Sequence, residues 1–197
     1  MIRVLLPLAT GVEEMEAVIM IDIFRRAGWH VMVAGLDEQI VTASRGVRIV
    51  TDCSWNNLQS TDFEILALAG GAGGTTVLRK DPRIIRTVKD FNHSKRLIAA
   101  ICAAPVVLHD AGILAGRNVT SHPSVAQEMT ASQWIDRAVV VDENIVTAQG
   151  AGTAFEFALT VVEIADSRLL ADNIARAICL PETISPAGLQ HPSRSRF

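Results

Sequence analysis

The sequence places one cysteine where its thiol could be activated as a nucleophile. Cys102 follows the apolar run Leu97–Ile101 and precedes Ala103-Ala104-Pro105, and a proline suits the first turn of a helix. Backbone N–H groups and the helix dipole at such a strand-to-helix turn favour a thiolate over a thiol. The same run also fits a small buried residue at the end of a core strand, so the local pattern alone leaves both interpretations open.

Glu16 is the candidate acid or base. With residues placed about 100° apart on the helix predicted over Glu13–Ala27, Glu16 falls in the middle of the apolar arc. A carboxyl group buried there must be paired, protonated or functional, because an unpaired buried charge costs several kcal/mol. The alternative is an acid in the first turn that reaches solvent and complements the helix dipole, which is the role we expect for Glu13 and Glu14.

Among the five histidines, His122 is best placed to serve the thiol. It follows the predicted strand Asn118–Ser121 and is fixed by Pro123. His109 lies two turns along the helix that follows Cys102, so we expect it to be structural or on the surface. No HxH, HExxH or Cys/His spacing occurs, and we predict neither a metal site nor a cofactor.

A glycine-rich segment, Gly70–Thr75, follows the predicted strand Glu64–Ala69. It is not a nucleotide-binding loop, because it has no P-loop lysine and Thr76 stands where the last glycine of GxGxxG would be. Glycines at a strand end let backbone N–H groups approach a reacting atom and stabilise an oxyanion. A flexible turn between a strand and a helix explains the segment equally well.

Short apolar runs alternate with helical patterns, which predicts a parallel sheet covered by helices. The predicted strands are Ile2–Leu8, Trp29–Leu36, Glu64–Ala69, Leu97–Ile101, Asn118–Ser121 and Ile145–Ala148. The predicted helices are Glu13–Ala27, Pro82–His93, Pro105–Ala111 and Ala154–Ala165. Gln39–Thr42 and Val47–Thr51 predict a hairpin at one edge of the sheet. In such sheets, sites form beyond the carboxyl ends of the strands, where the candidate residues fall.

Composition narrows the classes of function. With 197 residues, 49% of them hydrophobic, and a net charge of −3, the chain can form one soluble domain and has no basic surface for nucleic acid. The apolar runs are too short to cross a membrane. Pro7 and the acids after it interrupt the first run, so we interpret it as a strand and not a signal peptide. Three widely spaced cysteines fit reduced thiols in the cytoplasm.

These features together resemble the ThiJ/PfpI superfamily over residues 2–180, and most closely the branch of the parkinsonism-associated protein deglycase and bacterial YajL. The motifs that carry the resemblance are Gly11–Glu16, Arg25–Gly28, Val33–Leu36, Ala99–Pro105, His122–Pro123 and Gly150–Ala158. The resemblance implies a flavodoxin-like three-layer α/β/α sandwich with a mostly parallel sheet, a homodimer, and a nucleophilic cysteine on a tight elbow. It assigns Cys102 as the nucleophile, a protonated Glu16 as its hydrogen-bond partner, Gly71 and Ala103 as backbone donors, and His122 as a neighbour.

The chain also departs from the family pattern. Ala69 and Ala151 stand where relatives of this branch have prolines, which loosens the pocket walls that we expect them to form with Gly70 and Gly152. Ala103 replaces the histidine of the peptidase-like branch, which weakens a protease or amidase interpretation.

Two arginines match positions near the site or the dimer interface of relatives. Arg26 and Arg45 are candidates for binding anions, although a solvated helix face and a hairpin turn also explain them. Cys53 is expected near the dimer interface and Cys179 within the last helix.

The function that these residues predict is carbonyl chemistry at a thiol. We expect a glutathione-independent glyoxalase or protein deglycase that acts on methylglyoxal, glyoxal and their early adducts, in which Glu16 and His122 move protons. The alternative is an oxidative-stress sensor or redox-regulated chaperone that uses the same cysteine, and a role in thiamine biosynthesis has no phosphate-binding motif to support it. One domain is predicted over residues 1–180, with a surface or disordered extension over residues 181–197.

Overall fold

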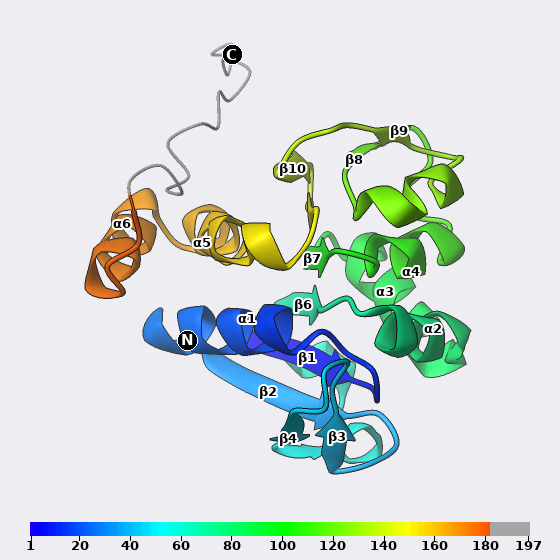
Figure 1. Ribbon diagram of the computed structural model, residues 1–197, viewed down its shortest axis with the longest axis horizontal. Coiled ribbons are helices and arrows are strands. Elements are labelled where there is room, and N and C mark those ends of the chain that lie inside the picture. The colour runs from blue at the N-terminus through cyan, green and yellow to red at the C-terminus, as the bar shows by residue number, and fades with distance from the viewer. Residues whose placement is uncertain (182–197) are drawn as a thin grey trace.

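Seven strands form the central sheet, and Figure 1 shows it between two layers of helices. The computed structural model describes residues 1–181, so the predicted C-terminal extension lies outside the described residues except for Pro181. The strands follow the order β10-β11-β7-β6-β1-β2-β5. Their bounds are β1 Arg3–Leu8, β2 His30–Gly35, β5 Cys53–Ser54, β6 Ile65–Leu68, β7 Leu97–Ile101, β10 Val139–Asp142 and β11 Ile145–Ala148. All neighbours are parallel except β10, which is antiparallel to β11.

The two middle strands β6 and β7 contain only apolar residues, because helices cover both faces of the sheet. In Figure 1, α1, α5 and α6 lie to the left of these strands, and α2, α3 and α4 lie to the right. Their bounds are α1 Glu14–Arg26, α2 Ala72–Lys80, α3 Pro82–His93, α4 Pro105–Asp110, α5 Ala154–Ala165 and α6 Arg168–Ala177. Phe24 and Phe157 fill the core on the α1 and α5 side, and Phe91 and Leu108 fill it on the other side. The result is the predicted three-layer α/β/α sandwich.

Two small sheets lie outside the central one. The predicted hairpin is confirmed as β3 (Ile40–Thr42) paired with β4 (Arg48–Val50), but it forms a sheet of its own, and the edge of the main sheet is β5. Likewise β8 is shorter than predicted, at Asn118–Val119, and pairs in parallel with β9, Gln133–Trp134. Four 3-10 turns complete the described chain: Trp55–Asn57, Ser60–Asp62, η3 Pro123–Glu128 and η4 Ala151–Thr153.

The glycine-rich segment Gly70–Thr75 is helical from Ala72 onward, and Gly70 and Gly71 form the connection from β6. α2 begins at Ala72 and includes Gly73 and Gly74. A Cβ on Gly74 would lie 2.8 Å from the backbone N of Val12, where it does not fit, and a Cβ on Gly73 would lie 3.2 Å from Gly11 Cα, which is a tight contact. Close packing therefore outweighs the low helix propensity of glycine, about 1 kcal/mol per residue below that of alanine. Within residues 1–181, no helix has the length and apolar character needed to cross a membrane.

Phe24 provides a test of this packing. Its side chain is fully buried and stacks on Trp29 with ring centroids 5.5 Å apart. We expect Phe24→Ala to lower the free energy of unfolding by about 3–5 kcal/mol, because it leaves a cavity between α1 and the sheet. Urea unfolding followed by circular dichroism measures this change. The control is Val18→Ala on the exposed face of the same helix, for which we expect a change within about 0.5 kcal/mol; equal losses in the two variants would contradict the assigned core.

Candidate active site

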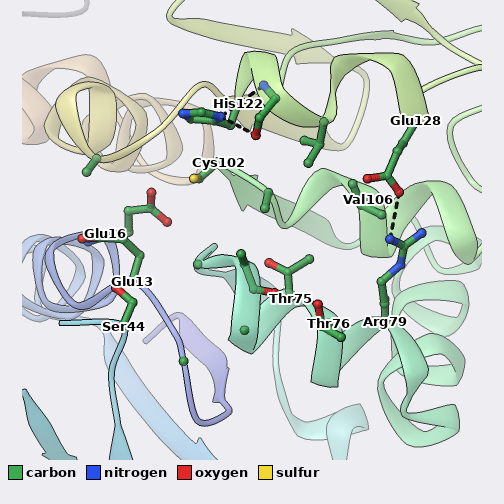
Figure 2. Close-up of a pocket in the computed structure, with 18 of the residues that line it drawn as sticks. Glu13, Glu16, Ser44, Thr75, Thr76, Arg79, Cys102, Val106, His122 and Glu128 are labelled. Carbon is green, nitrogen blue, oxygen red and sulfur yellow. Dashed lines mark hydrogen bonds and ion pairs between the residues drawn. The ribbon is translucent and has the colours of Figure 1, made fainter. Parts of the chain in front are cut away.

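A cavity of about 780 Å³ opens where the carboxyl ends of β1, β6 and β7 meet. These strands are neighbours in the sheet, so the segments that follow them converge although they lie far apart in the sequence. Figure 2 shows Cys102, Glu16 and His122 together at one end of the cavity. The wall also includes Gly71, Ala103, Arg45 and Ala151.

Cys102 sits on a strained elbow directly after β7. Its φ is +63°, a left-handed conformation that non-glycine residues rarely adopt. Two backbone hydrogen bonds maintain it: the Cys102 N–H donates to the Ala148 carbonyl (2.9 Å), and the His122 N–H donates to the Cys102 carbonyl (2.7 Å). The elbow turns the half-buried thiol into the cavity. Strain that the surrounding structure maintains in this way is common at functional sites.

Glu16 is a fully buried carboxylic acid. The first turn of α1 is fixed by Glu13, whose side chain accepts a hydrogen bond from the Glu16 N–H at 2.7 Å. Glu16 Oε2 accepts a hydrogen bond from the Gly70 N–H at 2.7 Å, whereas Oε1 is buried and has no hydrogen-bond partner among residues 1–181. Burial raises the pKa of Glu16 from 4.5 to about 7, against the opposing effect of the Gly70 N–H. The carboxyl group therefore carries a proton through a wide range of acidic pH.

Glu16 and Cys102 influence each other's ionisation. Burial, and then the neighbouring Glu16 carboxylate, raise the pKa of Cys102 to about 12, while the backbone N–H groups of Gly71 and Ala103 act in the opposite direction. The sequence predicts a thiolate stabilised by the start of the helix after Cys102, whereas the structure favours a protonated thiol. Burial and the nearby acid raise the pKa of Cys102 more than the backbone donors lower it. Above pH 7 the pair holds one proton and one negative charge. The thiolate forms when that proton moves from sulfur to Glu16.

Gly70 allows the two groups to meet. A Cβ on this residue would lie 2.6 Å from Cys102 Cβ and 2.9 Å from Glu16 Oε2, and neither separation is possible between nonbonded atoms. Gly71 is equally constrained, since it has a φ of +89° and a Cβ there would lie 2.4 Å from the Gly11 carbonyl oxygen. The paired glycines are thus required by close approach.

His122 forms the N-cap of the 3-10 turn η3, and its ring lines the cavity. Nδ1 lies 2.7 Å from Ser124 Oγ and 3.2 Å from the Ser124 backbone N. Its Cδ2 and Cys102 Sγ are both within 4 Å of one point, the position that a Cβ would occupy on Gly150. The structure therefore places His122 and the thiol on the same part of the cavity wall. His109, on α4, does not line this cavity.

The other predicted residues separate into two groups. Arg45 and Ala151 line the cavity, and Gly70 lies behind it as the hydrogen-bond donor to Glu16. Three residues do not line it: Arg26 pairs with Asp22 at 2.6 Å near the end of α1, Ala69 is fully buried, and Gly152 is exposed on η4.

The other two cysteines lie away from the cavity. Cys53 is half-buried in the edge strand β5. The placement of Cys179 within the last helix is wrong: α6 ends at Ala177, and Cys179 is exposed with a φ of +56°.

Two further features of the site are not predicted by the sequence analysis. Glu14 is buried and accepts hydrogen bonds from Ser44 Oγ (2.7 Å) and the Arg45 N–H (2.8 Å). It thereby fixes the turn between β3 and β4 against the mouth of the cavity, a contact that a helical wheel of α1 alone cannot show. At the far end, Arg79 pairs with Asp110 (2.7 Å) and Glu128 (2.8 Å), as Figure 2 shows for the Arg79–Glu128 pair.

The chemistry available in this cavity is that of a thiol, a carboxyl group and an imidazole. Within the part of the chain that the structure describes, no group of three His, Cys, Asp or Glu side chains could hold a metal ion. The backbone N–H groups of Gly71 and Ala103 are directed at the sulfur, so they can also reach an oxyanion that forms beside it. The thiol, the carboxyl group, the imidazole and the two backbone donors together suit covalent addition of the thiol to a carbonyl carbon, followed by proton transfer.

A sequence model of the DJ-1/PfpI family matches residues 2–164. The chain belongs to the DJ-1/PfpI family. The Parkinson disease protein 7 homolog of Danio rerio is 42% identical over 166 residues, which are 82% of this chain and 88% of the relative. The glutathione-independent glyoxalase DJR-1.2 of Caenorhabditis elegans is 36% identical over 170 residues, 85% of this chain and 90% of that protein.

Solved structures of the family agree with the fold. The crystal structure of Drosophila melanogaster DJ-1beta superposes with a TM-score of 0.88 at 36% identity and covers 91% of this chain and 98% of that chain. This similarity confirms the predicted family and its flavodoxin-like fold. Some relatives are longer: the chain spans 37% of the length of DJ-1 homolog B of Arabidopsis thaliana, with which it is 36% identical over 163 residues.

Because the pKa of Glu16 is raised in the folded protein, we expect the free energy of unfolding to depend on pH. A folded-state pKa of about 7, above the ordinary 4.5, gives a stabilising contribution that is complete below pH 4.5 and is lost as pH rises through 7. We expect Glu16→Gln, which cannot ionise, to gain on the order of 3 kcal/mol in unfolding free energy relative to wild type between pH 4.5 and 8. Urea unfolding at several pH values measures the gain, with Glu38→Gln at an exposed position as control. A difference that does not change with pH would contradict a buried neutral acid.

Gly70 offers a test of the coupling between acid and thiol. In wild type, the alkylation rate of Cys102 by iodoacetamide should rise with pH through about 7, where the pair loses its first proton. Gly70→Ala forces Glu16 and Cys102 apart, so we expect the midpoint to move to about 8.5–9, the ordinary range of a cysteine. Peptide mass spectrometry follows the reaction. The matched control is Gly152→Ala, where an added Cβ meets nothing within 4 Å; an unchanged midpoint in Gly70→Ala would show that the two groups are not coupled.

Proposed function

We propose that this protein is a cysteine-dependent, glutathione-independent glyoxalase that acts on small 1,2-dicarbonyls such as methylglyoxal and glyoxal. The observation that carries the proposal is the buried Glu16 carboxyl group beside Cys102, on an elbow that opens into a cavity. A glyoxalase needs a nucleophile for the aldehyde and one group that both accepts and returns a proton, and this pair supplies both. The similarity to a C. elegans protein named as a glutathione-independent glyoxalase supports the same function.

The first step is addition of the thiol to the aldehyde carbon. The sulfur–carbon bond forms, the carbonyl electron pair moves onto oxygen, and the thiol proton passes to the Glu16 carboxylate. The N–H groups of Gly71 and Ala103 stabilise the oxyanion, because they are directed at the sulfur to which the new bond is made. Protonation of the oxyanion by Glu16 then gives a hemithioacetal and restores the carboxylate.

The second step is an internal redox rearrangement. Glu16 removes the hydrogen on the former aldehyde carbon as a proton, and the electron pair forms a double bond to the neighbouring carbon while the carbonyl electrons of that carbon move onto its oxygen. The hydroxyl proton of the hemithioacetal passes to this second oxygen, which leaves an enediolate with its negative charge on the first oxygen, beside the N–H groups of Gly71 and Ala103. Return of the proton to that neighbouring carbon gives a thioester of a 2-hydroxy acid, so one carbon is oxidised and the other reduced without an external electron acceptor. Water then hydrolyses the thioester, which releases lactate or glycolate and the free thiol. The pKa of Glu16 near 7 suits a group that must both take and give a proton near neutral pH.

The cavity also has room for larger substrates. Its volume of about 780 Å³ lies within the range of about 300–1,000 Å³ that holds drug-sized ligands, and a three-carbon dicarbonyl occupies a small part of it. We include early adducts of the same aldehydes on cysteine, lysine or arginine side chains in the proposal. In that protein deglycase form, the adduct releases its amine or thiol as the aldehyde carbon becomes bonded to Cys102.

Two related expectations stay predictions. A redox-sensing role for Cys102 is compatible with the free Glu16 Oε1, which could donate a hydrogen bond to an oxidised sulfur. A cytoplasmic homodimer is compatible with the exposed apolar side chains of Met15 and Val18 on α1 and of Ile40 and Val50 on the hairpin.

Turnover of methylglyoxal without glutathione tests the proposal. We expect lactate formation by wild type and a loss of at least about 100-fold in kcat/KM for Cys102→Ser and for Glu16→Gln, since each removes a group that takes part in bond making or proton transfer. The control is Cys179→Ser, which changes an exposed thiol outside the cavity and should retain wild-type activity. Turnover by Cys102→Ser at the wild-type rate would exclude covalent catalysis by this thiol.

A further inference from the structure

We infer that Ser124 fixes the tautomer of His122, so that the neutral imidazole presents its Nε2–H to the second oxygen of a 1,2-dicarbonyl substrate as a hydrogen-bond donor and does not carry protons. This inference rests on the proposed function for the identity of the substrate. The tautomer itself follows from hydrogen bonds within the protein. This donor role differs from the proton-transfer role that the sequence predicts for His122.

His122 is the N-cap of η3, and its ring accepts a hydrogen bond there. The backbone N–H of Ser124 donates to His122 Nδ1 at an N–N distance of 3.2 Å. A backbone N–H cannot rotate away or accept a hydrogen bond, so Nδ1 must present a lone pair to it. In a neutral imidazole, the proton then resides on Nε2.

The Ser124 hydroxyl is consistent with this assignment. Its Oγ lies 2.7 Å from Nδ1, and a hydroxyl can donate to a lone pair as readily as it can accept from an N–H. If Nδ1 carried the proton instead, the hydroxyl could accept it, but the Ser124 N–H would face another N–H. The two contacts together therefore favour an unprotonated Nδ1.

The same contacts oppose a proton-carrying role. A histidine that accepts a proton becomes an imidazolium with a proton on both nitrogens, and the Ser124 N–H would lose its acceptor. Each turnover through His122 would thus break the cap of η3. Glu16 has no such constraint, because its Oε1 is free.

The position of the His122 ring allows its Nε2–H to donate a hydrogen bond to a substrate in the cavity. No group of residues 1–181 forms a hydrogen bond with Nε2, and the ring lines the cavity beside the thiol. Cδ2, the ring atom bonded to Nε2, lies 3.6 Å from the position of a Cβ on Gly150, and Cys102 Sγ lies 3.9 Å from the same point. A substrate bonded to the sulfur through one carbon therefore brings its second oxygen within the neighbourhood of Nε2. Gly71 and Ala103 serve the first oxygen, so His122 complements them.

Nuclear magnetic resonance tests the tautomer without any substrate. In protein labelled with 15N-histidine, long-range 1H–15N correlations of His122, assigned by their loss in His122→Gln, should show a protonated Nε2 and an unprotonated Nδ1. We expect Ser124→Ala to keep this pattern, because the backbone N–H remains. A protonated Nδ1 in wild type, or a switch to it in Ser124→Ala, would overturn the inference.

Two substitutions of His122 separate the donor from the proton carrier. The amide nitrogen of glutamine can occupy the place of Nε2, whereas asparagine reaches only the place of Nδ1 and is a good N-cap. We expect His122→Gln to retain kcat/KM for methylglyoxal within about 10-fold of wild type and His122→Asn to lose about 100-fold. Equal losses in both variants would indicate a proton carrier and overturn the inference. Absence of turnover by wild type would instead overturn the proposed function, and the resonance experiment would still decide the tautomer.

Discussion

A carboxyl group and a thiol can lie in contact in this protein because no side chain stands between them at Gly70. The Gly70 N–H donates to Glu16, and the space where its side chain would be is filled by Cys102 Cβ and the Glu16 carboxyl oxygen. Other features of the site depend on this approach. The cap provided by Glu13 sets the direction of Glu16, and the adjacent order of β1, β6 and β7 brings the three segments together.

This contact determines where charge can reside. Burial makes two separate negative charges costly, so one proton remains between the acid and the sulfur near neutral pH. The sulfur therefore stays protonated, and unreactive, until Glu16 accepts its proton and makes it nucleophilic. At that moment the backbone N–H groups can stabilise the charge that forms on the substrate. A permanently ionised thiol would gain reactivity toward any electrophile, whereas this arrangement links reactivity to a carbonyl bound in the cavity.

The sequence predicts the reactive residues of the site better than it predicts the residues and strands that surround them. Cys102 and Glu16 were found because their signals are local: a strand that runs into a proline-started helix, and an acid within an apolar arc. The sequence predicts that Glu14 reaches solvent, because its partners Ser44 and Arg45 lie about thirty residues away and a helical wheel contains no information about them. The helix α2 was missed because its glycines argue against a helix locally, and the close approach of Gly11 that requires them is a tertiary contact. The edge strands β5 and β10 are defined by pairing, which periodicity does not show.

The elbow at Cys102 has a consequence for the biosynthesis of the protein. Its strained conformation depends on a hydrogen bond to Ala148 in β11, and β11 follows the cysteine by more than forty residues. A growing chain that has not yet emerged to that point holds Cys102 as an ordinary, flexible cysteine. The strained elbow therefore forms late, when β11 pairs with β7, and any molecule truncated before residue 148 would lack the hydrogen bond that the Cys102 N–H donates to Ala148.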